Sequence, residues 1–121
     1  MTYVDGFVLP VPTKNKAKYR KVAREAGKMW KKHGALQYIE CWGDEMHPAA
    51  GGMKMAKFPK IAQAKRSEAV VFAFIIYKNK THRNKVNKAV MKECAEQQHD
   101  DVMPFDVKRM AWGGFTAIVE E

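Results

Sequence analysis

The chain has 121 residues, a length that excludes a two-domain enzyme with its site between the domains. With 46% hydrophobic and 29% charged residues, its composition excludes a disordered chain. Lysine and arginine outnumber aspartate and glutamate by 22 to 13, and the resulting charge of +9 favours acidic partners without choosing among RNA, DNA, membranes and small anions. The longest apolar run, residues 69–77, is about half as long as a membrane-spanning helix requires, so we expect no membrane partner.

The start of the chain lacks the basic region, apolar run and cleavage site of a secretory signal. The two cysteines, Cys41 and Cys94, lie far apart and form no CxxC motif. We therefore expect a cytoplasmic protein with reduced thiols.

Three elements are predicted in the first part of the chain. Aromatic and β-branched residues over 3–11 predict a strand. Thr13 is the expected N-cap of a helix, whose apolar positions recur at steps of three and four as far as His33. Gly34 then ends this helix, and an alternating pattern over residues 35–44 predicts the second strand.

A long interruption follows. Prolines and glycines break every pattern between residues 45 and 68, which predicts a long loop with room for one short helix over 59–66. Residues 69–77 are apolar at both parities, as in a strand that is covered on both faces.

The last part of the chain repeats the helix and strand pattern. Thr81 is expected to cap a second long helix that ends near Gln97. A polar turn is expected at residues 99–104, and residues 109–119 predict a fourth strand with paired glycines at its centre.

This order of elements predicts a single domain over residues 1–121 of the α+β class. It is the ferredoxin-like split βαβ arrangement, a four-stranded antiparallel sheet with both helices on one face and the third strand between the first and second. Because the third strand is apolar on both sides, the bare face needs a cover, and a second copy of the sheet is the simplest one. We therefore expect a homodimer with its sheets packed face to face, a dimeric α/β barrel.

Separated blocks of the sequence resemble the DUF1428 family, the YbaA-like proteins of unknown function. The blocks include Tyr3-Val4-Asp5-Gly6-Phe7-Val8, Trp30-x-x-His33-Gly34-Ala35-Leu36, Thr81-His82-Arg83-Asn84 and Met103-Pro104-Phe105-Asp106. The resemblance implies a small cytoplasmic bacterial protein with a dimeric α/β barrel fold and no established activity. The chain departs from the family in its Lys/Met-rich segment, residues 52–60, and in its basic first helix.

Carboxylates beside aromatic rings form the main candidate site. Tyr3 and Asp5 lie on one side of the first predicted strand, and Tyr38, Glu40 and Trp42 on one side of the second. If both rows face the same cavity, such a set suits a small polar ligand, with Asp5 or Glu40 as catalytic acid or base and the rings binding the ligand. The third strand lies between the other two in this topology, so the rows would flank it rather than touch. The alternative is that both carboxylates pair with basic side chains or lie in solvent at the dimer rim.

Two further residues are candidates for ligand binding. Arg83 follows His82 in the first turn of the second long helix, where free N–H groups favour an anion, although the pair could instead cap the helix locally. His33 lies beside Trp30 and is either a ligand contact or a hydrogen-bonded boundary residue. We expect no metal and no cofactor, because the sequence has neither a zinc spacing nor a glycine-rich phosphate motif.

Nucleic acid is the alternative partner. Residues 14–32 contain nine basic residues and one acid, Glu25. However, Tyr19 and Trp30 are expected on the core side of the helix, so they would not alternate with the charges as stacking platforms do, and the RNA-recognition signature is absent.

The sequence thus favours a homodimer that binds a small molecule in a pocket beside the sheet. By analogy with other proteins of this fold, monooxygenase- or isomerase-like activity is an option, and whether the protein is an enzyme stays open. A basic RNA-associated protein is the second interpretation and a purely structural dimer the third.

Overall fold

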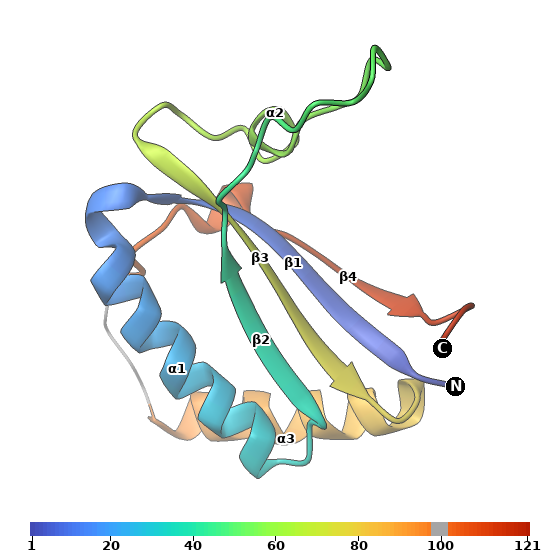
Figure 1. The fold of residues 1–121 in the computed structure, drawn as a ribbon. Coiled ribbons are helices and arrows are strands. Elements are labelled where there is room, and N and C mark those ends of the chain that lie inside the picture. Colours follow the sequence, from blue (N-terminus) through green and yellow to red (C-terminus); the bar gives the residue numbers. More distant parts are fainter. Residues whose placement is uncertain (98–101) are drawn as a thin grey trace.

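A computed structural model of the chain describes residues 1–97 and 102–121. All strand pairings are antiparallel, in the sheet order β2-β3-β1-β4. Figure 1 shows α1 and α3 on one side of this sheet. In chain order, the elements are β1 (Tyr3–Pro12), the 3-10 turn η1 (Thr13–Asn15), α1 (Lys16–Lys32), β2 (Gln37–Trp42), α2 (Phe58–Ile61), β3 (Glu68–Tyr77), α3 (Lys80–Gln97), the 3-10 turn η2 (Val107–Arg109) and β4 (Ala111–Thr116).

The predicted α+β class and the four-stranded antiparallel sheet are confirmed. The third strand lies between the first and second, as expected, because β3 pairs with both β1 and β2. Every strand was predicted within a few residues of its observed bounds, since each has a clear apolar pattern that turn residues interrupt.

The core lies between the sheet and the two long helices. Odd-numbered residues of β1 and β3 point toward the helices, because successive side chains of a strand alternate between faces. The buried apolar side chains form two clusters. One contains Tyr3, Ala35, Ile75, Tyr77, Val86 and Val90, and the other Leu9, Val11, Tyr19, Ala23 and Val71.

The opposite sheet face is largely apolar, and within the residues that the structure describes most of it is uncovered, with Pro10 and Val70 buried near the arm. We call it the open face. Phe72 is 44% exposed there and Phe115 61% exposed. The cross-strand register assigns it Val4, Gly6, Val8, Pro10, Pro12, Gln37, Ile39, Cys41, Glu68, Val70, Phe72, Phe74, Ile76, Ala111, Gly113 and Phe115. Glu68, at the end where the arm begins, is the only charged residue that the register places there, and it is paired with Arg109. The prediction that β3 is covered on both faces therefore holds only on the helix side within one chain.

Two predicted helix starts were wrong. The helix expected from Thr13 begins as a 3-10 turn, and α1 starts at Lys16 without a side-chain cap. The cap of α3 is Asn79, whose Oδ1 accepts a hydrogen bond from His82 N at 2.8 Å, and not Thr81, which lies inside the helix. Gly34 ends α1 as predicted, with a φ of 115° that favours glycine. Part of the turn expected at 99–104 lies outside the described residues.

Residues 43–67 form a projecting segment, which we call the arm. It includes α2 and leaves the end of the sheet on the side opposite α1 and α3 (Figure 1). It corresponds to the long loop predicted between residues 45 and 68, and the predicted short helix is shortened to four residues.

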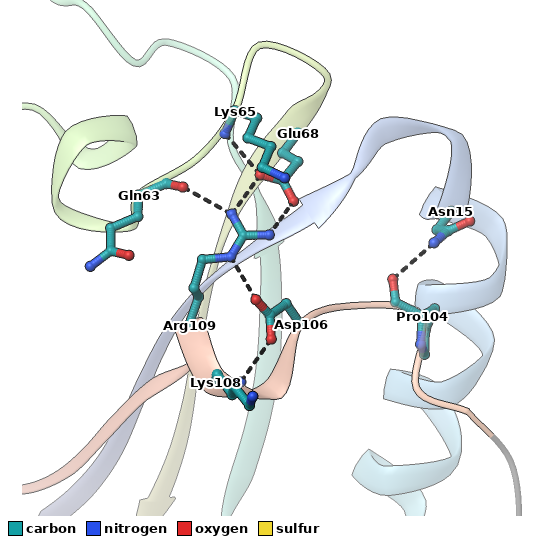
Figure 2. Close-up of polar contacts among 8 residues, drawn as sticks. All are labelled: Asn15, Gln63, Lys65, Glu68, Pro104, Asp106, Lys108 and Arg109. Atoms are coloured by element: carbon teal, nitrogen blue, oxygen red, sulfur yellow. Dashed lines mark hydrogen bonds and ion pairs between the residues drawn. The ribbon is translucent and has the colours of Figure 1, made fainter.

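The base of the arm is anchored by Arg109 (Figure 2). The guanidinium donates to both Glu68 oxygens, at 2.7 and 2.6 Å, to the Gln63 carbonyl at 2.9 Å and to Asp106 at 3.0 Å. The two hydrogen bonds from Arg109 to Glu68, together with the one from the Lys65 backbone N–H, lower the pKa of the Glu68 carboxyl from 4.5 to about 2. Arg109 thus ties η2 to the start of β3.

A candidate ligand-binding groove

A groove of about 580 Å³ runs between α1 and β2. Helix α1 supplies a wall of basic side chains, and β2 supplies the aromatic and acidic floor. The lining residues are Lys16, Tyr19, Arg20, Ala23, Arg24, Gly27, Lys28 and Lys31 from α1, Tyr38, Glu40, Cys41 and Trp42 from β2, and Val71 from β3.

The basic wall follows one row of the helix. Its residues recur mainly at intervals of four, which places a positive charge about every 6 Å along the groove. The Lys16 ammonium lies 5.1 Å from the centre of the Trp42 ring, a cation–π contact that links wall and floor. The basic row consists of Lys16, Arg20, Arg24, Lys28 and Lys31. Within residues 1–97 and 102–121, none of these five side chains forms an ion pair, so their positive charge is available to a ligand.

The floor centres on the Glu40 carboxylate. The Tyr19 hydroxyl donates to Glu40 Oε1, and the Tyr38 hydroxyl donates to Oε2 at 2.6 Å. Burial, reinforced by the adjacent carboxylate, raises the pKa of both phenols well above its ordinary value, so both remain protonated donors. Each carboxylate oxygen keeps a further lone pair for a ligand.

Gly27 explains how the Tyr38 ring packs so closely against α1. A Cβ atom at position 27 would lie 2.8 Å from Tyr38 Cδ1, well inside normal contact distance. A side chain there would displace the ring, and with it the hydroxyl that holds Glu40.

The other predicted polar residues form a separate cluster beneath α3. Arg83 Nε donates to Asp5 Oδ1 at 3.1 Å and an Arg83 terminal nitrogen donates to the Tyr3 hydroxyl at 3.1 Å. Asn87 donates to Asp5 Oδ2 at 3.3 Å and accepts from Trp30 at 3.0 Å. Asp5 is 1% exposed, so this carboxylate is paired with a basic side chain, one of the alternatives that the sequence left open.

The structure therefore divides the predicted site residues into two groups. Tyr38, Glu40 and Trp42 line the groove, whereas Tyr3, Asp5 and Arg83 do not. Both strand rows lie on the helix side of the sheet, but β3 separates them and each helix covers a different row.

His33 also lies outside the groove. Its Nε2 is 3.5 Å from Glu93 Oε2, where the end of α1 meets α3. Its neighbours place it at the contact between the two helices.

Tyr19 is a groove residue that the sequence did not predict. It was expected on the core side of α1, away from the charges. The structure shows that this buried ring also borders the groove beside Lys16 and Arg20. The signal was present in the spacing, because Tyr19, Ala23 and Gly27 form a four-residue stripe directly beside the basic row.

The described residues form neither a metal site nor a membrane-spanning helix. No group of three or more histidine, cysteine or acidic side chains is placed to hold a metal ion. Neither long helix in this part of the chain has an apolar stretch that could cross a membrane. Cys41 and Cys94 are free and exposed.

The fold and the groove define an α+β protein with a four-stranded antiparallel sheet and a basic cleft along one edge. The chain belongs to the DUF1428 family, described as proteins of unknown function, whose model matches residues 2–107. This confirms the family resemblance found in the sequence.

The similar proteins include uncharacterized protein YbaA of Escherichia coli strain K12 and its counterpart in Shigella flexneri. Each is 38% identical to this chain over 121 residues, covering all of both proteins. Among solved structures, the de novo designed protein Foldit4 has a TM-score of 0.47 and 9% identity, and the similarity covers 97% of this chain and 99% of the design.

Proposed function

We propose that this protein binds a small organic anion in the groove between α1 and β2. The observation that carries the proposal is the row of basic side chains without ion-pair partners, among the described residues, facing a floor of two tyrosines, a tryptophan and a carboxylate. The volume of about 580 Å³ lies within the range typical of small-molecule sites.

The groove suggests which part of the ligand contacts which residues. A carboxylate or phosphate group would lie against Arg20, Arg24 and Lys28, because guanidinium groups bind such anions with two parallel hydrogen bonds. A flat or apolar body would stack on the rings of Tyr38 and Trp42. A ligand hydroxyl or amine would donate to Glu40.

If the groove is catalytic, Glu40 is the acid or base and Tyr38 orients it. Monooxygenase- or isomerase-like chemistry would follow the precedent of this fold, an analogy at the level of fold alone. The proposal assigns no ligand contact to Asp5, because its oxygens bind Arg83 and Asn87 beneath α3.

We also propose that the chain is a ferredoxin-like split βαβ domain that forms a homodimer, with two open faces packed into a dimeric α/β barrel. The only charged residue that the register places on the open face is Glu68 at its edge, paired with Arg109, and the exposed Phe72 and Phe115 form an apolar surface that water solvates poorly. A twofold pairing buries the same surface on both copies. Phe72→Ser together with Phe115→Ser is therefore expected to convert a dimer into a folded monomer, as measured by light scattering.

The binding proposal is tested by calorimetry with a panel of aromatic and aliphatic carboxylates and phosphates. The key variant changes Arg20, Arg24 and Lys28 to glutamine. A matched control changes Lys85, Lys88 and Lys92 of α3 to glutamine, which removes the same charge from another exposed surface. We expect an anion from the panel to bind the wild type and the control, and to bind the groove variant at least about 100-fold more weakly. Equal binding by all three proteins would reject the groove as the site.

One observation favours RNA as a second candidate. The groove combines a charge at nearly every turn of α1 with aromatic rings, the combination that binds single-stranded nucleic acid without sequence preference. Affinity for RNA would fall steeply between 50 and about 200 mM salt, whereas a ligand with one charged group would be affected little. If an oligonucleotide binds with steep salt dependence and no small anion binds, the groove would be assigned to RNA binding.

A further inference from the structure

The arm carries exposed apolar side chains that nothing in its own chain covers among the described residues. Met53 is 69% exposed, Met55 61%, Phe58 47% and Ile61 60%. Residues 46–64 also contain Lys54, Lys57 and Lys60 and no acidic residue. The arm thus presents an apolar and positively charged surface.

This surface is continuous with the open face. A hollow of about 420 Å³ lies between them, lined by Met46 and Phe58 of the arm and by Val70 and Phe72 of β3. In Figure 1 the arm extends away from the side that α1 and α3 cover. A body packed on the open face would therefore also meet the arm.

The C-terminal tail, residues 117–121, has the complementary character. Ile118 is 89% exposed and Val119 74% exposed, and Glu120 and Glu121 follow them. The tail continues from Thr116, which pairs with Tyr3 at one end of β1, while the arm joins β3 at Glu68, which pairs with Pro12 at the other end. The nine steps from Tyr3 to Pro12 separate the two ends of β1 by about 30 Å, so the arm and the tail of one chain lie apart.

We propose that, in the face-to-face dimer, the arm of each copy packs against the tail of the partner copy. This inference rests on the proposed dimer and adds its orientation. The end of one sheet that carries the arm lies over the end of the partner sheet that carries the tail. That orientation joins lysines to glutamates and apolar side chains to apolar side chains at both ends. The reverse orientation would bring two lysine-rich arms together, and like charges facing each other oppose association.

Charge reversal tests the pairing. Lys54→Glu, Lys57→Glu and Lys60→Glu in the arm, or Glu120→Lys and Glu121→Lys in the tail, should each weaken the dimer by at least about fivefold in sedimentation equilibrium. The two sets combined should recover most of the loss, because the pairing is restored with opposite sign. Lys85→Glu, Lys88→Glu and Lys92→Glu on α3 form the matched control and should leave the dimer unchanged.

Zero-length carbodiimide cross-linking locates the contact directly. In a dimer mixed from ¹⁵N-labelled and unlabelled chains, a Lys54, Lys57 or Lys60 cross-link to Glu120 or Glu121 should join one chain of each label. Cross-links confined to a single chain, or links from the tail to other lysines only, would overturn the orientation.

The outcomes separate this inference from the dimer on which it rests. A wild-type monomer at micromolar concentration would overturn both. A wild-type dimer that neither charge reversal weakens would overturn the arm contact and leave the sheet dimer intact. The same would hold if the arm variants lost binding to phosphatidylglycerol vesicles without any change in the dimer, which would assign the arm to a lipid surface.

Discussion

Single residues in this protein have roles that their local environment decides. Asp5 and Glu40 are both carboxylates on the helix side of the sheet, yet Asp5 is held by Arg83 and Asn87, and Glu40 by two tyrosines. The first carboxylate stabilises a buried cluster, whereas the second faces a groove. The sequence placed each carboxylate on one side of its own strand and left open whether the two rows face the same cavity. It could not separate the two roles, because the partners come from distant elements: α3 for Asp5, and α1 and β2 for Glu40.

Glu68 should make stability depend on acid pH. Its pKa is lowered from 4.5 to about 2 in the folded state, so the stabilisation is fully present above pH 4.5 and is lost as the pH falls toward 2. Wild-type free energy of unfolding, measured with urea at several pH values, should decrease through this window. Glu68→Gln should be less stable at pH 7 and show a smaller decrease below pH 4.5. A variant with the wild-type pH profile would contradict the role of the Arg109 pair.

For Gly27→Ala, helix propensity and the Tyr38 contact predict changes of opposite sign in the free energy of unfolding. Helix propensity alone predicts that alanine stabilises α1 by about 1 kcal/mol. The contact with Tyr38 predicts instead a net loss of about 1 kcal/mol, because the added Cβ overlaps the ring. In a Tyr38→Ala background the overlap is gone and the gain should return. Urea unfolding of the two pairs measures both signs, and stabilisation by Gly27→Ala in the wild-type background would refute the close contact.

At the scale of elements, strands were easier to predict than helix starts. The apolar pattern of β3 and the alternation in β2 identified both strands, since periodicity extends over many residues. A helix start depends on one side chain, and both Asn79 and Thr81 are residues that can cap. The groove was harder still, because it needs the packing of α1 against β2, which no local pattern contains.

The cap of α3 gives a direct comparison of two neighbouring residues. Asn79→Ala removes the acceptor for the His82 N–H and should lower the free energy of unfolding by about 1 kcal/mol. Thr81→Ala should cost far less, since Thr81 lies within the helix. The two variants are compared by thermal and urea unfolding, and an equal or larger loss for Thr81→Ala would contradict the assignment of the cap.

At the scale of the whole molecule, charge and apolar surface are separated. The basic row of α1 borders the groove on the helix side of the sheet, while the open face on the other side is apolar apart from Glu68 at its edge, which is paired with Arg109. Under the proposed function, the groove serves ligand binding and the open face serves association between copies. Replacing the basic row should therefore leave the oligomeric state unchanged, and replacing the exposed phenylalanines should leave the groove chemistry intact within each folded chain.

Native mass spectrometry of the untagged protein, isolated gently from its own host and compared with the Arg20, Arg24 and Lys28 glutamine variant, tests the central claim most directly. We predict a discrete small adduct on each wild-type chain, retained at moderate salt and absent from the variant. A bare wild-type protein that also binds no anion from the panel, or a heterogeneous nucleic-acid load that salt removes, would contradict the proposal that the groove holds a small organic anion.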